Sequence, residues 1–247
     1  MTPARRTFGR SDGRVRTLGL AALVAASGCA AQARAPEGDP FVRAYRALRP
    51  SVVLLTMKIP SVDKKHRGTF DDAYGSGVVV ASDATGSDIL TVEHVVRDAR
   101  DLRATLDERR AVPAHVVAVD TKNDLALVRI AVPDRPVARL AARARDIEPG
   151  TAVGIAGYPI PDAFSDEHLG IKTSVYAGRV SSQRADSLEL DLPVIPGESG
   201  GPIFDATTGE VVALGESRFD DEKAIGFGIP IEVARAFLAR TLKVAVR

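Results

Sequence analysis

Short β-rich runs separated by Gly, Asp and Pro turns fill most of this chain, and they limit the folds that it can adopt. The runs form two series on either side of a break at Val132-Pro133-Asp134-Arg135-Pro136. The first series comprises Ser51–Ile59, Gly77–Val80, Ile89–Val92, Val112–Val119 and Leu125–Ile130. The second comprises Ala152–Gly157, Thr173–Ser181, Leu188–Leu192, Pro202–Phe204, Val211–Glu216 and Ile225–Ile229.

Helical signals are confined to the two ends of this region. Pro40–Leu48 is a short amphipathic stretch, and the tail Ile231–Leu242 has helical spacing. Many short strands in two groups, closed by a terminal helix, favour two β-barrels over a parallel α/β sheet. The sequence therefore predicts an all-β fold with one barrel at about residues 50–132, a second at about 147–231 and a helix at 231–242.

Composition and charge agree with such a core and exclude one class of partner. The 247 residues are 45% hydrophobic with 5% aromatic side chains, which suits aliphatic, β-branched cores. Five of the 33 basic residues but only one of the 32 acidic residues lie in positions 1–29, so the remainder carries 28 basic against 31 acidic side chains. This balance indicates no basic surface for nucleic acid.

The first 29 residues have the pattern of an export signal, and residues 30–40 that of a tether. Arginines precede the apolar run Leu18–Ala26, which is too short to span a bilayer permanently. Ala26-Ser27-Gly28-Cys29 resembles the bacterial lipoprotein box, which predicts lipidation of Cys29 and a membrane anchor facing the periplasm or cell surface. Cleavage after Ala31-Gln32-Ala33, giving a soluble exported protein, and a twin-arginine signal from Arg5-Arg6-Thr7-Phe8 are the alternatives. Cys29 is the only cysteine, so no internal disulfide is expected.

The segment Gly197-Glu198-Ser199-Gly200-Gly201-Pro202 places one hydroxyl among glycines, as a nucleophilic serine requires. A serine needs a base and a group that orients the base. His94, in Leu90-Thr91-Val92-Glu93-His94, and Asp124, before the apolar strand Leu125–Ile130, are the candidates. All four histidines precede Ser199, which contradicts the α/β-hydrolase nucleophile elbow, where histidine comes last.

For each candidate there is another residue or another interpretation to consider. His66 lies in a charged run, His115 in a strand and His168 in a polar loop. Asp120 competes with Asp124 but is interpreted as a turn residue. Ser199 itself could be a simple turn serine, and Thr91 is expected to support the histidine loop.

These residues together resemble the trypsin-like serine proteases, and more closely their HtrA/Deg branch. The resemblance spans roughly residues 42–240. It is carried by Arg49–Val53, Gly75–Val78, Thr91–Val95, Asp120–Leu127, Gly157–Pro159, the serine loop and Ala224–Pro230. It implies two six-stranded antiparallel barrels, with residues 41–247 forming the protease domain. It also implies Ser199 as nucleophile, His94 as base, Asp124 as its orienting acid, and backbone N–H groups of Gly197 and Ser199 as the oxyanion hole.

Family position further implies the lining of the primary substrate pocket. These residues are Pro193, Val194, Ile195, Gly226, Phe227 and Gly228. With no acid at its base, the pocket is expected to accept small or medium aliphatic residues. Glu93 and Glu198 depart from the family, and the polar loops 61–74 and 160–172 are candidates for gating the site. A carboxylate at position 93 would weaken the base if it lay close to the imidazole.

The sequence thus predicts an exported serine endopeptidase that acts on protein or peptide substrates, with quality control in the cell envelope as one role. No metal cluster and no cofactor motif is found in the sequence, and no PDZ domain fits after residue 242. The alternative is an inactive or conditionally active relative that binds peptides or unfolded chains. Oligomeric state is not predicted.

Overall fold

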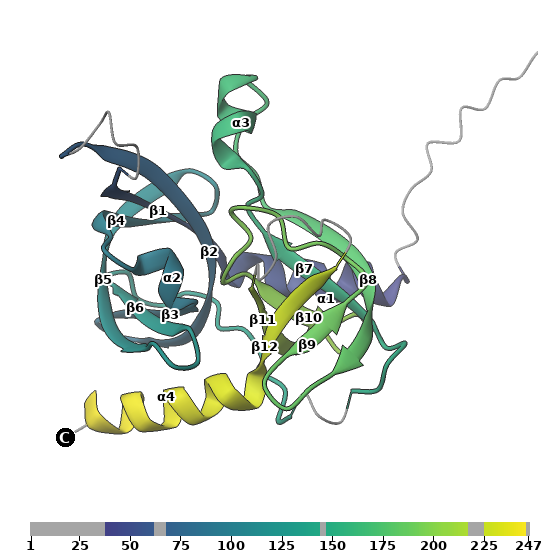
Figure 1. The fold of residues 1–247 in the computed structure, drawn as a ribbon. Helices are drawn as coiled ribbons and strands as arrows, with labels where there is room; N and C mark the ends of the chain where they lie inside the picture. Colours follow the sequence, from purple (N-terminus) through teal and green to yellow (C-terminus); the bar gives the residue numbers. More distant parts are fainter. Residues whose placement is uncertain (1–37, 62–67, 144–146, 217–224, 246–247) are drawn as a thin grey trace, which may run out of the picture. The chain divides into compact units, whose positions relative to one another are not determined.

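The computed structural model describes residues 38–61, 68–143, 147–216 and 225–245. Two closed barrels account for its strands (Figure 1). The first barrel is built from β1 (Val52–Pro60), β2 (Phe70–Asp83), β3 (Gly86–Thr91), β4 (Arg100–Leu106), β5 (Arg110–Asp120) and β6 (Leu125–Ile130). The second is built from β7 (Ala152–Gly157), β8 (Ser174–Gln183), β9 (Leu188–Leu190), β10 (Pro202–Asp205), β11 (Val211–Glu216) and β12 (Gly226–Pro230).

Both barrels close with antiparallel neighbours throughout. The strand orders are β1-β2-β3-β6-β5-β4 and β10-β11-β12-β9-β8-β7. Strands β3, β6 and β12 are buried along almost their whole length, and aliphatic side chains fill the interiors. The prediction of an all-β fold with two six-stranded barrels and a carboxyl-terminal helix is therefore confirmed.

The helices attach to the barrels at defined points. Asp39 caps α1 (Pro40–Leu48) through a 2.8 Å bond from Phe41 N–H to its carboxylate, with Pro40 in the first turn. Phe41 then packs on Phe204 of β10 at 5.5 Å between ring centroids. A one-turn 3-10 helix, η1 (Arg49–Ser51), leads from α1 into β1.

The carboxyl-terminal helix α4 (Ile231–Ala245) touches both barrels. It contacts β6 of the first and β11 and β12 of the second (Figure 1). Arg240 of α4 donates a 2.9 Å bond to Asp120 at the end of β5. Across the described ranges, no helix combines the length and apolar character needed to cross a membrane.

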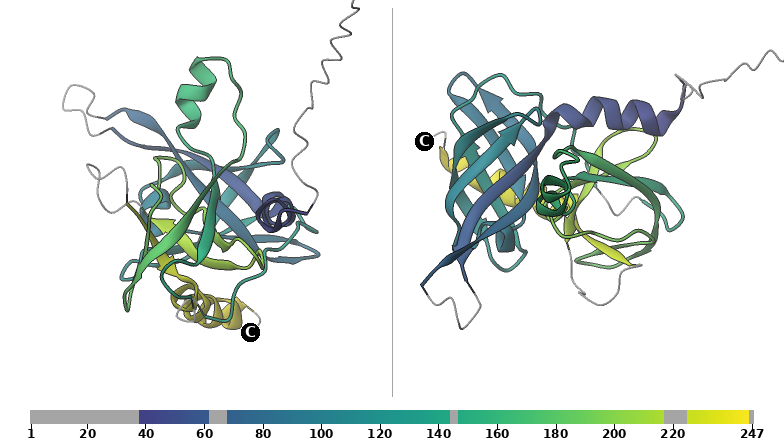
Figure 2. Two further views of the ribbon diagram at one scale, coloured as in Figure 1. Left: turned by 90° about the vertical axis from the view of Figure 1, so that its right-hand side faces the viewer. Right: turned by 90° about the horizontal axis from the view of Figure 1, so that it is seen from above.

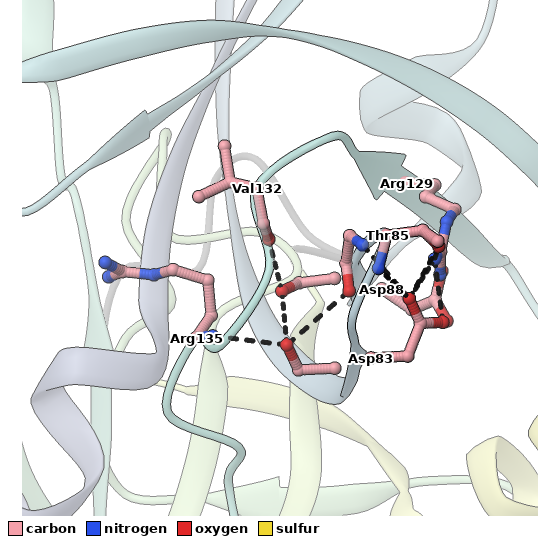
Figure 3. Close-up of polar contacts among 9 residues, drawn as sticks. Asp83, Thr85, Asp88, Arg129, Val132 and Arg135 are labelled. Atoms are coloured by element: carbon pink, nitrogen blue, oxygen red, sulfur yellow. Dashed lines mark hydrogen bonds and ion pairs between the residues drawn. The ribbon is translucent and has the colours of Figure 1, made fainter.

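A polar network joins the β2–β3 turn to β6 and to the segment that leaves the first barrel (Figure 3). The Asp83 carboxylate accepts bonds from Thr85 and Gly86 in the turn and from Arg129 of β6. The Thr85 bonds, and then Arg129, hold the pKa of Asp83 well below its usual value. Nearby, Ser87 Oγ donates to Val132 O at 2.7 Å, so the strand ends and the linker to the second barrel are tied together.

Several local elements differ from the sequence expectation. Strand β4 was not predicted, and β2 begins at Phe70 inside the region expected to be a polar loop. Two short helices, α2 (Glu93–Val96) and α3 (Pro161–Asp166), were also not predicted; α3 stands out from the second barrel (Figures 1 and 2). Each helix has at most six residues, so it is too short for a 3.6-residue period to show in the sequence.

Candidate active site

Asp124 holds His94 by both its backbone and its ring. The N–H of Glu93 donates to Asp124 O at 3.1 Å, and the N–H of His94 donates to Asp124 Oδ1 at 2.8 Å. The His94 ring nitrogen Nδ1 lies 2.6 Å from Asp124 Oδ2. Because Nδ1 is engaged by the carboxylate, Nε2 is the ring nitrogen left for another partner.

The backbone conformation of Asp124 and the packing of α2 position the His94–Asp124 pair at the surface. Asp124 lies in the turn between β5 and β6 with a φ of 50°, a left-handed conformation that Asp tolerates better than most residues. Helix α2 packs closely on β2, since a Cβ at Gly75 would lie 2.4 Å from Val95 Cγ1. The side chains of His94 and Asp124 are 35% and 22% exposed, so the pair borders solvent.

The competing carboxylates have other partners. Asp120 accepts bonds from Asn123 and Arg240, as a turn residue would. Glu93 is buried and its carboxylate forms a bidentate ion pair with Arg97 one turn along. Arg97 therefore balances the charge of the carboxylate that sequence analysis placed beside the imidazole.

The serine loop is anchored to both barrels. Ser76 N–H of β2 donates to Ser199 O at 2.9 Å, and Gly200 N–H donates to Gly215 O of β11 at 2.8 Å. Gly200 has a φ of 83°, and a Cβ there would lie 2.2 Å from Thr91 Oγ1. The loop therefore passes directly against Thr91, three residues before His94. Within the described residues, no hydrogen bond joins the Ser199 hydroxyl to the His94 ring.

Two backbone donors in this loop are left without acceptors. Neither Gly197 N–H nor Ser199 N–H bonds to any residue that the structure describes, although Glu198 N–H between them donates to Ile195 O at 2.8 Å. The Pro196 carbonyl is turned away by a 2.8 Å bond from Ile160 N–H. Because Gly197 and Ser199 are buried, two unpaired donors on this loop are an unusual feature.

Gly197 is required by the backbone conformation. Its φ is 95°, and a Cβ would lie 2.3 Å from Tyr158 O. Any other residue would therefore be strained and would displace the loop. The glycine before Glu198 thus fixes the direction of its own N–H group.

Ser76 is a supporting residue whose role was not predicted from the sequence. Its buried hydroxyl donates to Gly197 O at 2.7 Å and accepts from Tyr158 N–H at 3.0 Å. Thr91 Oγ1 in turn donates to Ser76 O at 2.7 Å. The histidine loop and the serine loop are thereby joined through one strand of the first barrel. The only sequence signal was the position of Ser76 between two glycines.

The predicted pocket residues are only partly brought together. A Cβ at Gly226 would lie 2.3 Å from Leu192 O and 3.2 Å from Val194 Cγ2, so β12 runs against the segment that includes Pro193, Val194 and Ile195. A Cβ at Gly228 would instead meet Ile203 and Ala213. Val194 and Phe227 are buried, while Pro193 and Ile195 are half-buried. Gly226 is therefore the residue of β12 placed opposite the 193–195 segment.

Glu198 has an environment that the sequence did not reveal. Its side chain is completely buried, and Oε2 accepts a 2.9 Å bond from Ile195 N–H. Burial raises the pKa of this carboxyl from 4.5 to about 7, while the Ile195 bond opposes the rise.

The export signal, Cys29 and most of the tether lie outside the described residues.

Comparison with known proteins gives consistent results. Residues 75–214, more than half of the chain, match the model described as the trypsin-like peptidase domain. The putative serine protease HhoB of Synechocystis is 29% identical over 71% of this chain and 41% of its own length. A probable periplasmic serine endoprotease, DegP-like, of Pseudomonas fluorescens is 31% identical over 65% of this chain and 33% of its own. The chain thus spans less than half the length of these relatives.

Solved structures share the fold. The serine endoprotease from Yersinia pestis is 26% identical with a TM-score of 0.65, covering 82% of this chain and 66% of that one. The HtrA-type protease AlgW with a tripeptide is 24% identical with a TM-score of 0.66, covering 81% and 62%. These likenesses extend over both barrels.

Proposed function

Because the chain belongs to the trypsin-like peptidase family, we propose that it is a serine endopeptidase in which Ser199, His94 and Asp124 cleave peptide bonds through an acyl-enzyme. The observation that carries the proposal is the pair of unpaired N–H groups at Gly197 and Ser199. A loop without a catalytic role would have no reason to leave two backbone N–H groups unpaired, since unpaired backbone donors in buried residues are rare.

In the proposed reaction Ser199 Oγ attacks the carbonyl carbon of the scissile bond. His94 Nε2 accepts the hydroxyl proton and later delivers it to the departing amine. The 2.6 Å contact between Asp124 Oδ2 and Nδ1 keeps the proton of the neutral ring on Nδ1 and stabilises the imidazolium. Catalytic hydrogen bonds often shorten only in the substrate complex, so the missing Ser199–His94 bond is compatible with this role.

The oxyanion of the tetrahedral intermediate would accept hydrogen bonds from Gly197 and Ser199. Since the Pro196 carbonyl is held by Ile160 N–H, it does not occupy the position of the oxyanion as an acceptor for these donors. Two donors held in this way would stabilise the charge that develops in the transition state, and such stabilisation is usually the largest single contribution to catalysis. Water then hydrolyses the acyl-enzyme, with His94 again as base.

The pocket lining supports a preference for an aliphatic residue before the cleaved bond. The segment of Pro193, Val194 and Ile195 carries no charge, and Gly226 faces it. Such a pocket has nothing to pair with Lys or Arg. Profiling of a peptide library, read as kcat/KM for each residue, tests this preference.

The cellular setting is proposed from the amino terminus and from relatives. A DegP-like relative is described as periplasmic, and residues 1–29 resemble an export signal ending at Cys29. We therefore place the enzyme in the cell envelope, where it would act on protein substrates, including those of quality control. Mass spectrometry of the exported protein should detect a lipidated Cys29, whereas cleavage after Ala33 would yield a soluble form.

Labelling with a fluorophosphonate tests the activity and separates it from a peptide-binding module. Wild-type protein should be labelled at Ser199, and Ser199→Ala should not be labelled. Ser181→Ala, a change at an exposed serine of β8, serves as the matched control and should be labelled like the wild type. Absence of labelling in all three folded proteins would favour the binding module.

A further inference from the structure

Glu198 lies between the two unpaired donors and uses only half of its hydrogen-bonding capacity. Its side chain is 0% exposed. Oε2 accepts from Ile195 N–H at 2.9 Å, but Oε1 is buried and has no hydrogen-bond partner among the described residues. A buried oxygen without a partner is costly, and more so when it carries charge.

The carboxyl closes the turn that precedes Ser199. Ile195 N–H donates to the Glu198 side chain while Glu198 N–H donates to Ile195 O at 2.8 Å. These reciprocal bonds connect the wall of the proposed substrate pocket to the residue before the nucleophile. Gly197, inside the closed turn, carries one of the two donors.

Among the residues that the structure describes, none places a positive charge against Glu198. Its stem packs on β7, where a Cβ at Gly157 would lie 3.3 Å from both Cα and Cγ of Glu198. A Cβ at Gly215 of β11 would lie 3.4 Å from its carbonyl oxygen. The titratable neighbour is Tyr176 of β8, whose own pKa is raised by burial and by the Glu198 charge. None of the described basic side chains contributes to the pKa of Glu198.

We propose that Glu198 is a pH-dependent positioning residue: its protonated form holds the Ile195–Ser199 turn in the geometry that exposes both oxyanion donors, and its ionisation releases that turn. The inference rests on the proposed function of this site. Ionisation would place an unbalanced charge in the interior, and the charge is relieved only if the side chain reaches water. Because the same side chain closes the turn, that movement breaks the Ile195 bond and turns the N–H groups of Gly197 and Ser199 out of position, while their carbonyls stay bonded to Ser76.

The direction and size of the effect follow from the two environments. A carboxyl in water ionises near 4.5, while burial raises the pKa of Glu198 to about 7, so alkaline conditions favour the released turn. The gap between these two pKa values limits the shift in the equilibrium between the held and released turns to about 300-fold.

Hydrogen exchange tests the turn without relying on activity. Peptides covering residues 195–201 are compared at pH 6 and pH 8 in wild type, Glu198→Gln and Glu210→Gln, after correction for intrinsic exchange. The matched control is Glu210, which lies between β10 and β11 of the same barrel and pairs with Arg139. Wild type and Glu210→Gln should lose protection at pH 8, and Glu198→Gln should not. Equal behaviour of all three would overturn the proposal, whether or not the protein is an active enzyme.

The pH profile of kcat/KM for a peptide substrate provides the second test. For wild type, kcat/KM should fall several-fold at alkaline pH, whereas Glu198→Gln should show no such fall. A wild-type profile without an alkaline limb contradicts the inference while leaving the peptidase intact. If Ser199-dependent turnover is missing at every pH, the proposed function fails, and hydrogen exchange alone decides the role of Glu198.

Discussion

Replacing Glu198 by Gln should change how the stability of the whole domain depends on pH. The carboxyl is completely buried and its pKa is raised to about 7, against 4.5 in an exposed glutamate. The folded state therefore binds this proton more tightly than the unfolded state does. Stability is highest below about pH 4.5 and falls as pH rises toward 7, after which the loss is complete.

The size of the loss follows from the same two values. A difference of one pKa unit corresponds to about 1.4 kcal/mol, so the folded protein should lose about 3 kcal/mol between pH 4.5 and pH 8. Gln has nearly the same shape and can still accept from Ile195 N–H, but it does not titrate. The stability of the variant relative to wild type should therefore increase by about 3 kcal/mol across this range.

Urea unfolding at pH 5 and pH 8 measures this difference directly. Other carboxylates titrate equally in both proteins and cancel from the comparison. With a slope of about 1–3 kcal/mol per M, the midpoint of Glu198→Gln should move upward relative to wild type by about 1 M or more. Glu210→Gln should follow the wild type. A difference between Glu198→Gln and wild type that is the same at both pH values would refute the reasoning.

Three further substitutions test the site. Asp124→Asn should fold, as judged by circular dichroism, but lower kcat by about 10⁴-fold on a peptide substrate, because an amide at this position favours the wrong tautomer of His94. Ser76→Ala removes a partner from Gly197 O and from Tyr158 N–H and should lower the free energy of unfolding by about 2–4 kcal/mol in urea titrations. Gly197→Ala cannot keep a φ of 95° with its Cβ near Tyr158 O; kcat should fall by about 10²-fold or more, and unchanged turnover would contradict the oxyanion role.

The fold could be predicted because its strands follow simple patterns of burial. Every strand of the second barrel corresponds to a run identified in the sequence, as do all but one of the first. The exception, β4, starts with exposed Arg100 and Asp101 and then alternates buried Leu102, Ala104 and Leu106 with exposed Arg103 and half-buried Thr105. In a strand rich in arginine and aspartate, that alternation is hard to distinguish from a polar loop.

The site could be predicted only in part, since its residues meet through long-range contacts. The sequence indicated His94, Asp124 and Ser199, and the structure pairs the first two. The sequence did not indicate that Ser76 would link the two loops, because a serine between glycines is also common in turns. Nor did it indicate the burial of Glu198, since glutamate is rarely found completely buried.

The serine loop depends on the first barrel as much as on its own. Its carbonyls at Gly197 and Ser199 both accept hydrogen bonds from Ser76 of β2, through the hydroxyl and the N–H respectively. Within the second barrel, the Glu198 carboxylate accepts a hydrogen bond from Ile195 N–H and so closes the turn before Ser199. Ionisation of Glu198 therefore loosens the turn before the nucleophile while leaving the Ser76 contacts in place. For this reason we expect the response to pH to be confined to residues 195–199, with exchange in β2 and around His94 unchanged.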